Sequence, residues 1–320
     1  MSEPMPVSSV AKRPEAVSTV VVGSHLLLVF APVYAAAILP ANGWLLVGWL
    51  AFGFLMNGLL NLMHEAAHYH VFRRRGANDL LGRWVLGPLA AADFDAYRQR
   101  HWDHHRHLGQ PNDPKITYHI DVRGRRMLGL VLRCLLLVEA VHKFHHQRRD
   151  HDEPAPGNSP AWLGRTLLVQ VLFAASLTAA AWVAGNAGFW PAVRHAALVY
   201  LFVYVYGLGS VTILAASIRA LAEHQVAGPG DAHTGAAALR NFSCNSLTRL
   251  CFGAYGFGEH ATHHQRPAVP YYRLPEATRI LAETEASFAP TQGYLSTLRR
   301  LIARPRAANN ALAAGGSSTD

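Results

Sequence analysis

The chain has few charged residues and few cysteines for its length. Only 15% of its 320 residues are Asp, Glu, Lys or Arg, and 51% are hydrophobic, whereas soluble domains carry about 25% charged residues. The three cysteines, Cys134, Cys244 and Cys251, form no CxxC pattern, which excludes a disulfide framework and a thiolate metal site. The shortage of charge predicts that much of the chain faces lipid instead of water.

The hydrophobic residues are concentrated in long runs, of which four are long enough to cross a bilayer as helices of about 20 residues. These runs are 20–39, 44–63, 163–183 and 196–218. We therefore expect an all-α membrane protein with four transmembrane helices in two hairpins and a cytosolic helical cap. Shorter apolar runs at 80–92 and 127–141 are expected to lie in the membrane interface. We expect a single domain over 20–305, with disordered segments at 1–19 and 306–320.

The basic residues are distributed unevenly around these runs. Of 29 Lys and Arg residues, 15 lie in 64–162, 10 lie from Arg219 onward, and one lies in 184–195. This asymmetry is typical of the positive-inside rule. It favours an integral membrane protein whose termini and active site are cytoplasmic, and it explains the net charge of +9 without a nucleic-acid partner.

Histidine is the residue that the chain has in excess. There are 19, and nine of them fall in four places. Three places are the strings HEAAH at 64–68, HWDHH at 101–105 and HATHH at 260–264, and the fourth is a single histidine after Glu223. The nine are His64, His68, His101, His104, His105, His224, His260, His263 and His264. Neutral imidazole is the commonest ligand for transition metals, and nine ligands are too many for one zinc ion but suit two irons.

The spacing of the three strings also indicates metal binding. His64 and His68 are four residues apart and so share one helical face. Alone, this HExxH string is a zinc-protease signature with Glu65 as the base. The second and third strings repeat one HxxHH spacing, which chance does not readily produce. Imidazole ligation without thiolates suits iron, zinc or copper, and two such metals suit dioxygen activation and hydrogen removal from a membrane-embedded substrate.

These three strings and the pair Glu223-His224, with QRPAVPYYRLP at 265–275 and Asn112-Asp113-Pro114, resemble the membrane-bound fatty acid desaturase and hydroxylase superfamily over about residues 44–275. The resemblance implies that the nine histidines ligate two Fe ions, with O2 as co-substrate. It also implies a fatty acid desaturase of the acyl-lipid type, or alternatively a lipid or carotenoid hydroxylase or ketolase. The first string is one residue shorter than is typical of acyl-CoA desaturases, which favours the other lipid members. Electrons are expected from a separate ferredoxin- or cytochrome-type carrier with its reductase.

Other residues around the strings have expected roles as well. Glu65, Asp103 and Glu223 are expected to hydrogen-bond the ligand imidazoles, and His70 and His107 are expected to lie outside the ligand set. His224 has an alternative role as the cap of a helix C-terminus. A further HxxHH, made by His142, His145 and His146, lies in a basic loop and is expected not to bind metal. Two other classes remain open, a membrane zinc protease built on HEAAH and a histidine-rich metal transporter or store.

Overall fold

The computed structural model describes residues 13–39, 43–108, 110, 113, 114, 122, 124–149, 160–185, 188–224, 239–285 and 291–303. Four of its helices are long and apolar enough to cross a membrane: Glu15–Ile38, Gly43–Ala67, Ala161–Val183 and Phe189–Glu223. A mostly helical protein with four candidate spans is therefore confirmed. The expected disorder at 306–320, and at 1–12 of the N-terminal segment, lies outside the described residues.

Helix α1 (Glu15–Ile38) begins earlier than expected, so that residues 15–19 are helical and not disordered. Pro14 immediately precedes the helix, where a residue without an N–H group interrupts no hydrogen bond. Its carbonyl accepts from the Ser18 amide at 3.2 Å. The helix therefore begins before its apolar run, because Glu15 and its neighbours can form a first turn without burying charge.

Helix α2 (Gly43–Ala67) is the central helix of the spans. In its most apolar stretch 56% of the residues are buried, against 22–39% in the other three spans. Its C-terminal turn continues past the predicted end at 63 and includes His64. Glycine permits a close helix approach at Gly53, where an added Cβ would lie 2.3 Å from the Cβ of Val211.

The fourth span is longer than the predicted 196–218. It is one continuous helix built from α9 (Phe189–Val199), the π-helical turns η4 (Tyr200–Tyr206) and η5 (Leu208–Thr212), and α10 (Ile213–Glu223). It begins after Gly188, whose φ of 99° suits glycine. Pro191 is tolerated because it lies in the first turn. At the other end, the i,i+4 ion pair between Arg219 and Glu223 at 3.0 Å extends the helix beyond its apolar run.

The segment after α2 packs among the spans. It contains α3 (Arg75–Leu81), η2 (Gly82–Leu86) and α4 (Gly87–Leu89). Gln170, on α8 (Pro160–Val183), donates to the Pro88 carbonyl at 2.8 Å, and the Tyr204 hydroxyl donates to the Leu89 carbonyl at 2.8 Å. The part around Pro88 that was expected in the interface is therefore buried against two spans.

Helices α6 (Arg126–Leu135) and α7 (Val138–Arg149) cover the run that was expected to be an interfacial amphipathic helix. Helix α6 contacts η5 and α10 on one side. On its other side Leu128, Leu132 and Leu136 are exposed, at 60%, 49% and 72%. The structure thus has the amphipathic character that the sequence indicates for this segment.

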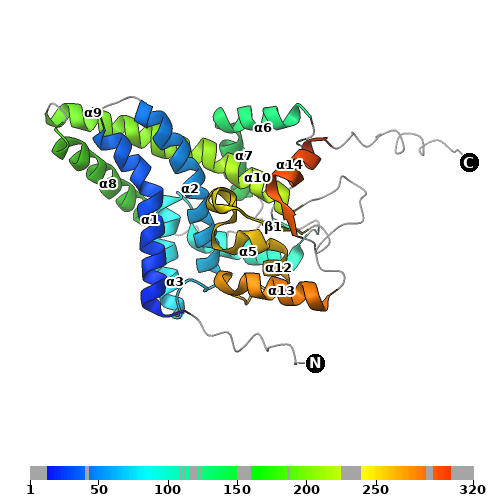
Figure 1. Ribbon diagram of the computed structural model, residues 1–320. Helices are drawn as coiled ribbons and strands as arrows, with labels where there is room; N and C mark the ends of the chain where they lie inside the picture. Colours follow the sequence, from blue (N-terminus) through cyan, green and yellow to red (C-terminus); the bar gives the residue numbers. More distant parts are fainter. Residues whose placement is uncertain are drawn as a thin grey trace, which may run out of the picture.

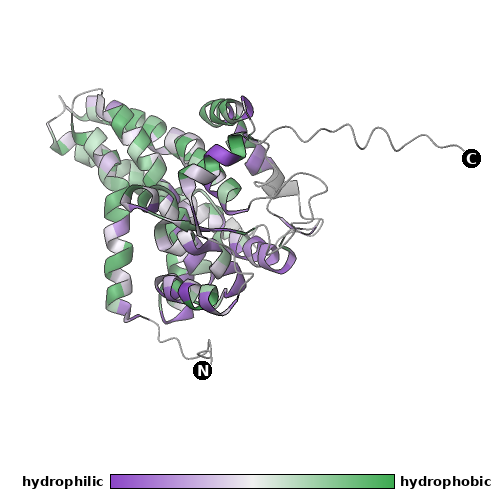
Figure 2. Cartoon of the chain, turned by 45° about the vertical axis from the view of Figure 1, so that its right-hand side comes forward, coloured by the Kyte–Doolittle hydropathy of each residue, from purple (hydrophilic) through white to green (hydrophobic). Residues whose placement is uncertain are grey.

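The remaining elements form a polar, mostly helical region beside the spans (Figure 1). It comprises α5 (Phe94–His107), α11 (Ser246–Thr248), the π turn η7 (Arg249–Gly253), the 3-10 turns η8 (Ala254–Glu259) and η9 (Tyr271–Arg273), α12 (His260–Gln265), α13 (Leu274–Thr284) and α14 (Tyr294–Ala303). Strands β1 (Asn241–Ser243) and β2 (Thr291–Gly293) pair in parallel within it. Figure 2 shows hydrophobic residues concentrated in the long helices and hydrophilic ones in the shorter helices.

Candidate metal centre

The first histidine string is presented by the end of α2. His64 lies in the last turn of the helix, and His68 follows immediately. The His68 amide still donates to the His64 carbonyl at 3.2 Å, so that the helical spacing is kept. The two imidazole rings consequently lie on one face, with centroids 4.8 Å apart.

The second string lies on α5, whose start is fixed by Asp93. The Asp93 side chain accepts hydrogen bonds from the backbone amides of Asp95 and Ala96, which caps the helix. His101, His104 and His105 occupy positions i, i+3 and i+4 and point away from the exposed side of α5. His101 and His104 are buried.

The third string forms the short helix α12, and a side chain from β1 caps it. The amide oxygen of Asn241 accepts from the backbone amides of Ala261 and Thr262, at 2.9 and 3.2 Å. The segment before α12 is held against α2, because Asn57 and Asn61 donate to the carbonyls of Cys251 and Phe252. These contacts place the third string directly opposite the first.

The nine histidines gather into two groups. One group contains His64, His68, His101, His105 and His263. The other is made of two overlapping sets that share one residue, His104 with His224 and His264, and Glu223 with His224 and His260. Within each set the candidate ligand atoms lie within 4.8 Å of one another. We call these the five-histidine group and the His224 group.

Each HxxHH string is divided between the two groups in the same way. The i,i+4 pair of the second string, His101 and His105, joins the five-histidine group, and His104 joins the other. In the third string the i,i+4 pair joins the His224 group, and His263 crosses to the five-histidine group. This division follows from helix geometry, because residues four apart are separated by a small angle and the intervening histidine projects to the side. Two facing helices thereby contribute imidazoles to two adjacent candidate sites.

Nitrogen–nitrogen distances within the groups are short. The Nε2 atom of His101 lies 2.7 Å from Nε2 of His68 and 3.0 Å from Nε2 of His105. Nε2 of His224 lies 2.9 Å from Nε2 of His260. Two imidazoles bound at about 2.1 Å to one metal have nitrogens roughly 3.0–3.4 Å apart. One of the three distances lies in this range and the other two are slightly shorter, so the nitrogens in each group converge closely enough to ligate one first-row transition metal.

His224 lies at the C-terminus of α10, as its alternative role as a helix cap requires. Its imidazole is nevertheless buried at 3% exposure and contacts the rings of His104 and His260, at 5.1 and 4.7 Å between centroids. The ring thus joins the cluster instead of facing the end of its own helix.

His264 also has the character of a ligand. Its pKa is lowered well below 6.5, first by burial and then by the neighbouring imidazoles of His260, His105, His104 and His224. Its Nε2 atom has no hydrogen-bond partner among the described residues, although it lies in the His224 group. A neutral ring with an available lone pair is the form that binds metal.

Acidic residues hold some of these rings in place. Glu65 is 1% exposed; one of its oxygens lies 2.9 Å from His64 Nδ1, and the other accepts from the Tyr271 amide at 3.3 Å. Glu223 is also 1% exposed, and it lies 3.7 Å from His260 Nδ1 and accepts from the Tyr294 hydroxyl at 3.4 Å. A carboxylate at Nδ1 directs Nε2 toward the metal.

Asp103 does not have the contact expected for it. It accepts from Arg106 at 2.8 Å on the outer side of α5, because it is two residues from both His101 and His105 and so projects from the opposite face. The carboxylate beside His104 is Asp113, with Oδ1 2.8 Å from Nδ1. Sequence reasoning gave Asp113 no role, although its place in Asn112-Asp113-Pro114 after the second string was a usable signal.

The other histidines near the strings lie outside both groups. His70 contacts Glu65 at 3.4 Å and stacks on the ring of His68, a candidate ligand. His107 faces Gln110. His142 and His145 are exposed on α7, and the His146 side chain lies outside the described part of the structure. Among the described residues, no group that could hold a metal includes these histidines.

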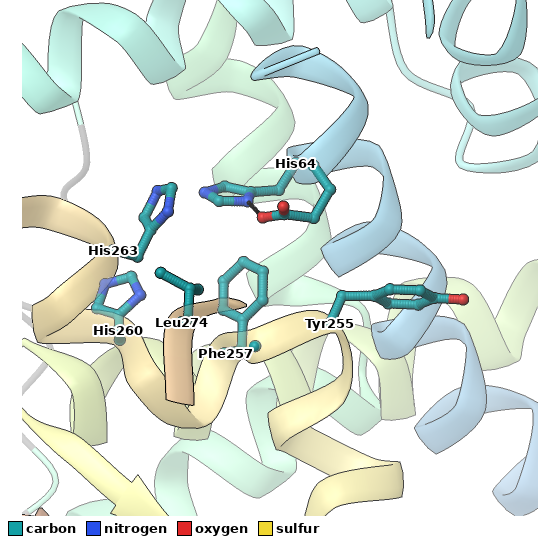
Figure 3. Close-up of a pocket in the computed structure, with 8 residues that line it drawn as sticks. His64, Tyr255, Phe257, His260, His263 and Leu274 are labelled. Atoms are coloured by element: carbon teal, nitrogen blue, oxygen red, sulfur yellow. Dashed lines mark hydrogen bonds and ion pairs between the residues drawn. The ribbon is translucent and has the colours of Figure 1, made fainter. Parts of the chain in front are cut away.

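A small pocket, too narrow to hold a water molecule in this structure, lies against residues of both groups (Figure 3). His64 and His263 face each other on one side of it, with His260 close by, and Phe257 and Leu274 form its apolar wall. Tyr255 also lines the pocket, but its ring extends away from the histidines. Its φ of 55° lies in the left-handed region, a strained conformation of the kind found at functional sites.

The comparisons with known proteins agree with this geometry. A family model described as "Fatty acid desaturase" matches residues 25–295. The chain belongs to this family.

Several relatives within this superfamily are carotenoid ketolases. Zeaxanthin 4-ketolase of Chlamydomonas reinhardtii is 26% identical over 246 residues, 75% of this chain and 46% of that protein. Beta-carotene ketolase of Paracoccus sp. (strain N81106 / MBIC 01143) is 26% identical over 247 residues, 75% of this chain and 81% of that protein. Beta-carotene ketolase of Haematococcus lacustris is 38% identical over 58 residues, 18% of each chain. The match therefore covers less than half the length of the Chlamydomonas protein.

Proposed function

We propose that this chain is an O2-dependent membrane di-iron oxygenase that forms a ketone on a carotenoid. The observation that carries the proposal is the match over three quarters of the chain to two carotenoid ketolases. The apolar side chains of Phe257 and Leu274, beside both histidine groups, agree with an apolar substrate. Acyl-lipid desaturation, the leading expectation from the sequence, is the second candidate because the family is that of fatty acid desaturases.

One iron would be held by the five-histidine group and the other by His104, His224, His260 and His264. Bound iron would supply the activation of O2. The chain's own residues would orient the ligand imidazoles and enclose the reacting carbon. Glu65 and Asp113 hold the rings of His64 and His104 by their Nδ1 atoms. Phe257 and Leu274 present apolar surface to the reacting carbon and exclude water.

The formation of a ketone determines how many electrons the protein needs. Insertion of one oxygen into a C–H bond consumes one O2, two electrons and two protons, and yields an alcohol and one water. A second insertion at the same carbon gives a geminal diol, which loses water to form the ketone. Two rounds therefore need four electrons, which we assign to an external ferredoxin- or cytochrome-type carrier with its reductase.

The orientation in the membrane is also a proposal. We infer that α1 with α2, and α8 with the fourth span, form two hairpins whose histidine-bearing ends and polar cap face the cytoplasm, as do both termini. The excess of Lys and Arg in 64–162 and after 218 supports this orientation. The proposal predicts that a cysteine placed at Ala184, in a variant lacking the native cysteines, is labelled by an impermeant maleimide from outside intact cells. Labelling only after lysis would contradict it.

A zinc protease and a metal transporter fit the geometry less well. A protease built on HEAAH would leave His101 and His263 dispensable, yet both pack against His64, with ring centroids 4.3 and 4.5 Å away. A metal transporter would need ligands along a transmembrane path, whereas the nine histidines gather at one end of the spans.

The test is product analysis on the purified protein in lipid nanodiscs, supplied with ferredoxin, reductase and either beta-carotene or a phospholipid. The proposal predicts a beta-carotene product that has gained one oxygen and lost two hydrogens, with 18O incorporated from 18O2 before exchange. His263→Ala should form none. A phospholipid product that has lost two hydrogens without gaining oxygen would support the desaturase candidate and contradict the ketolase.

A further inference from the structure

A partly exposed tryptophan lies in direct contact with the five-histidine group. The Trp102 ring on α5 has its centroid 4.7 Å from that of His68 and 5.8 Å from that of His105. Both histidines belong to the group. Because electron tunnelling falls off steeply with distance, an aromatic ring that reaches from the surface to two candidate ligands is a short route for electrons.

Arginines precede and follow this tryptophan along α5. Arg98 and Arg106 are four residues before and after it, so all three share one face of α5. Arg98 stacks over the Tyr69 ring, with its guanidinium carbon 4.4 Å from the centroid, and donates to the Tyr69 hydroxyl at 2.9 Å. Arg75 lies over the same ring at 5.3 Å. We call Tyr69, Arg75, Arg98, Trp102 and Arg106 the Trp102 surface.

The charge of this surface is basic beyond its internal ion pairs. Asp79 pairs with Arg98 at 2.5 Å, and Asp103 pairs with Arg106 at 2.8 Å. Arg75 is exposed and follows Arg73 and Arg74 in the chain, both of them exposed as well. Tryptophan, tyrosine and arginine are also the residues that contribute most to protein–protein binding energy.

The composition of α5 favours a protein partner over a lipid surface. A helix that lies on a bilayer exposes large apolar residues toward it, as α6 does with Leu128 and Leu132. Helix α5, all of which the structure describes, has none of the large hydrophobic residues that are classed as exposed. Its outer face instead combines charge with one aromatic ring.

We propose that the Trp102 surface docks an acidic one-electron carrier protein and that Trp102 conducts its electrons to the five-histidine group. This inference rests on the proposed function, which requires electrons from outside. For each oxygen insertion, two reduced carriers dock in turn, and each is oxidised by one electron. With two protons and one O2, these two electrons convert one C–H bond into C–OH and one O2 into that oxygen and one water.

Charge reversal at the rim tests the docking. Arg75→Glu and Arg106→Glu should each slow the reduction of the iron-loaded protein by reduced plant-type [2Fe–2S] ferredoxin about tenfold at low salt, and raising the salt should shrink the difference. The matched control is Arg279→Glu on α13, an exposed arginine in an i,i+4 ion pair with Glu283, which should react like the wild type. Equal rates in all four proteins would overturn the proposal.

Replacement of the ring tests the route. Trp102→Leu should slow reduction by saturating ferredoxin at least about tenfold with unchanged iron content, and Trp102→Phe should recover part of the rate. The control is Trp84→Leu, since Trp84 is 44% exposed beside Arg165 and touches none of the nine histidines. Normal reduction of Trp102→Leu would overturn the route, as would a loss of rate that merely follows a loss of iron.

Two further measurements separate this proposal from the proposed function and from lipid binding by the same surface. Ferredoxin affinity is measured on metal-free protein by titration of fluorescently labelled ferredoxin, so the docking is tested even if the iron assignment or the carotenoid substrate is wrong. The same variants are compared in nanodiscs with and without phosphatidylserine. If the arginine variants alter the response to phosphatidylserine and leave ferredoxin binding unchanged, the surface binds lipid and the proposal is wrong.

Discussion

Asp103 and Asp113 are both near the second histidine string in the chain, but their side chains have different partners. Asp113 is 8% exposed and lies 2.8 Å from His104 Nδ1, whereas Asp103 pairs with Arg106 on the outer side of α5. We expect Asp113→Asn to weaken iron binding at the His224 group by about 10- to 100-fold, because an amide no longer fixes the ring's tautomer. Asp103→Asn is the matched control. Iron content after dialysis against a graded chelator measures the difference, and equal retention in the two variants would refute the role of Asp113.

His264 predicts a pH dependence of the metal-free protein. Its pKa is lowered in the folded state by burial and by neighbouring imidazoles, so the unfolded chain binds a proton that the folded chain does not. Stability therefore rises with pH through this range and is lost as the pH falls below about 6.5, the unfolded value. The melting temperature of chelator-treated protein should drop between pH 7.5 and pH 5.5, and His264→Gln should reduce the drop. A melting temperature independent of pH would contradict this.

At the scale of elements, the sequence predicted the histidine-bearing segments but not how they combine. The helical spacing of His64 with His68, and of the two HxxHH strings, was sufficient to place each on one helix face. The division of each string between two groups was not predictable, because it depends on α5 and α12 facing each other across the end of α2. The role of Asp113 was not predictable either, since its contact with His104 is made from a loop and does not follow from helical spacing.

The contact between α2 and the fourth span gives a prediction about stability. A Cβ at Gly53 would lie 2.3 Å from the Val211 Cβ, and the Thr212 hydroxyl donates to the Gly53 carbonyl at 3.0 Å. We expect Gly53→Ala to destabilise the protein by about 1–3 kcal/mol by overpacking this contact. Gly23→Ala on α1 is the control, because a Cβ there meets nothing within 4 Å. Thermal unfolding in detergent should separate the two variants, and equal melting temperatures would contradict the close approach.

At the scale of the whole molecule, the low charge and the long apolar runs were sufficient to predict a helical membrane protein. They were insufficient for the ends of the spans. The first span begins at Glu15 and the fourth extends from Phe189 to Glu223, since capping and ion pairing continue a helix into polar sequence that hydropathy alone assigns to loops. The choice among substrates was also beyond the sequence, because desaturation and ketone formation both begin with loss of hydrogen and differ in how the pocket positions the carbon.

The central claim is that the nine histidines form two metal sites at the end of the spans. The most direct test is metal analysis of detergent-purified protein, with His263→Ala and His224→Ala beside the wild type. The account predicts about two irons per chain in the wild type and about one in each variant, because His263 and His224 belong to different groups. A single zinc that is retained in both variants would contradict the two-site arrangement and the oxygenase built on it.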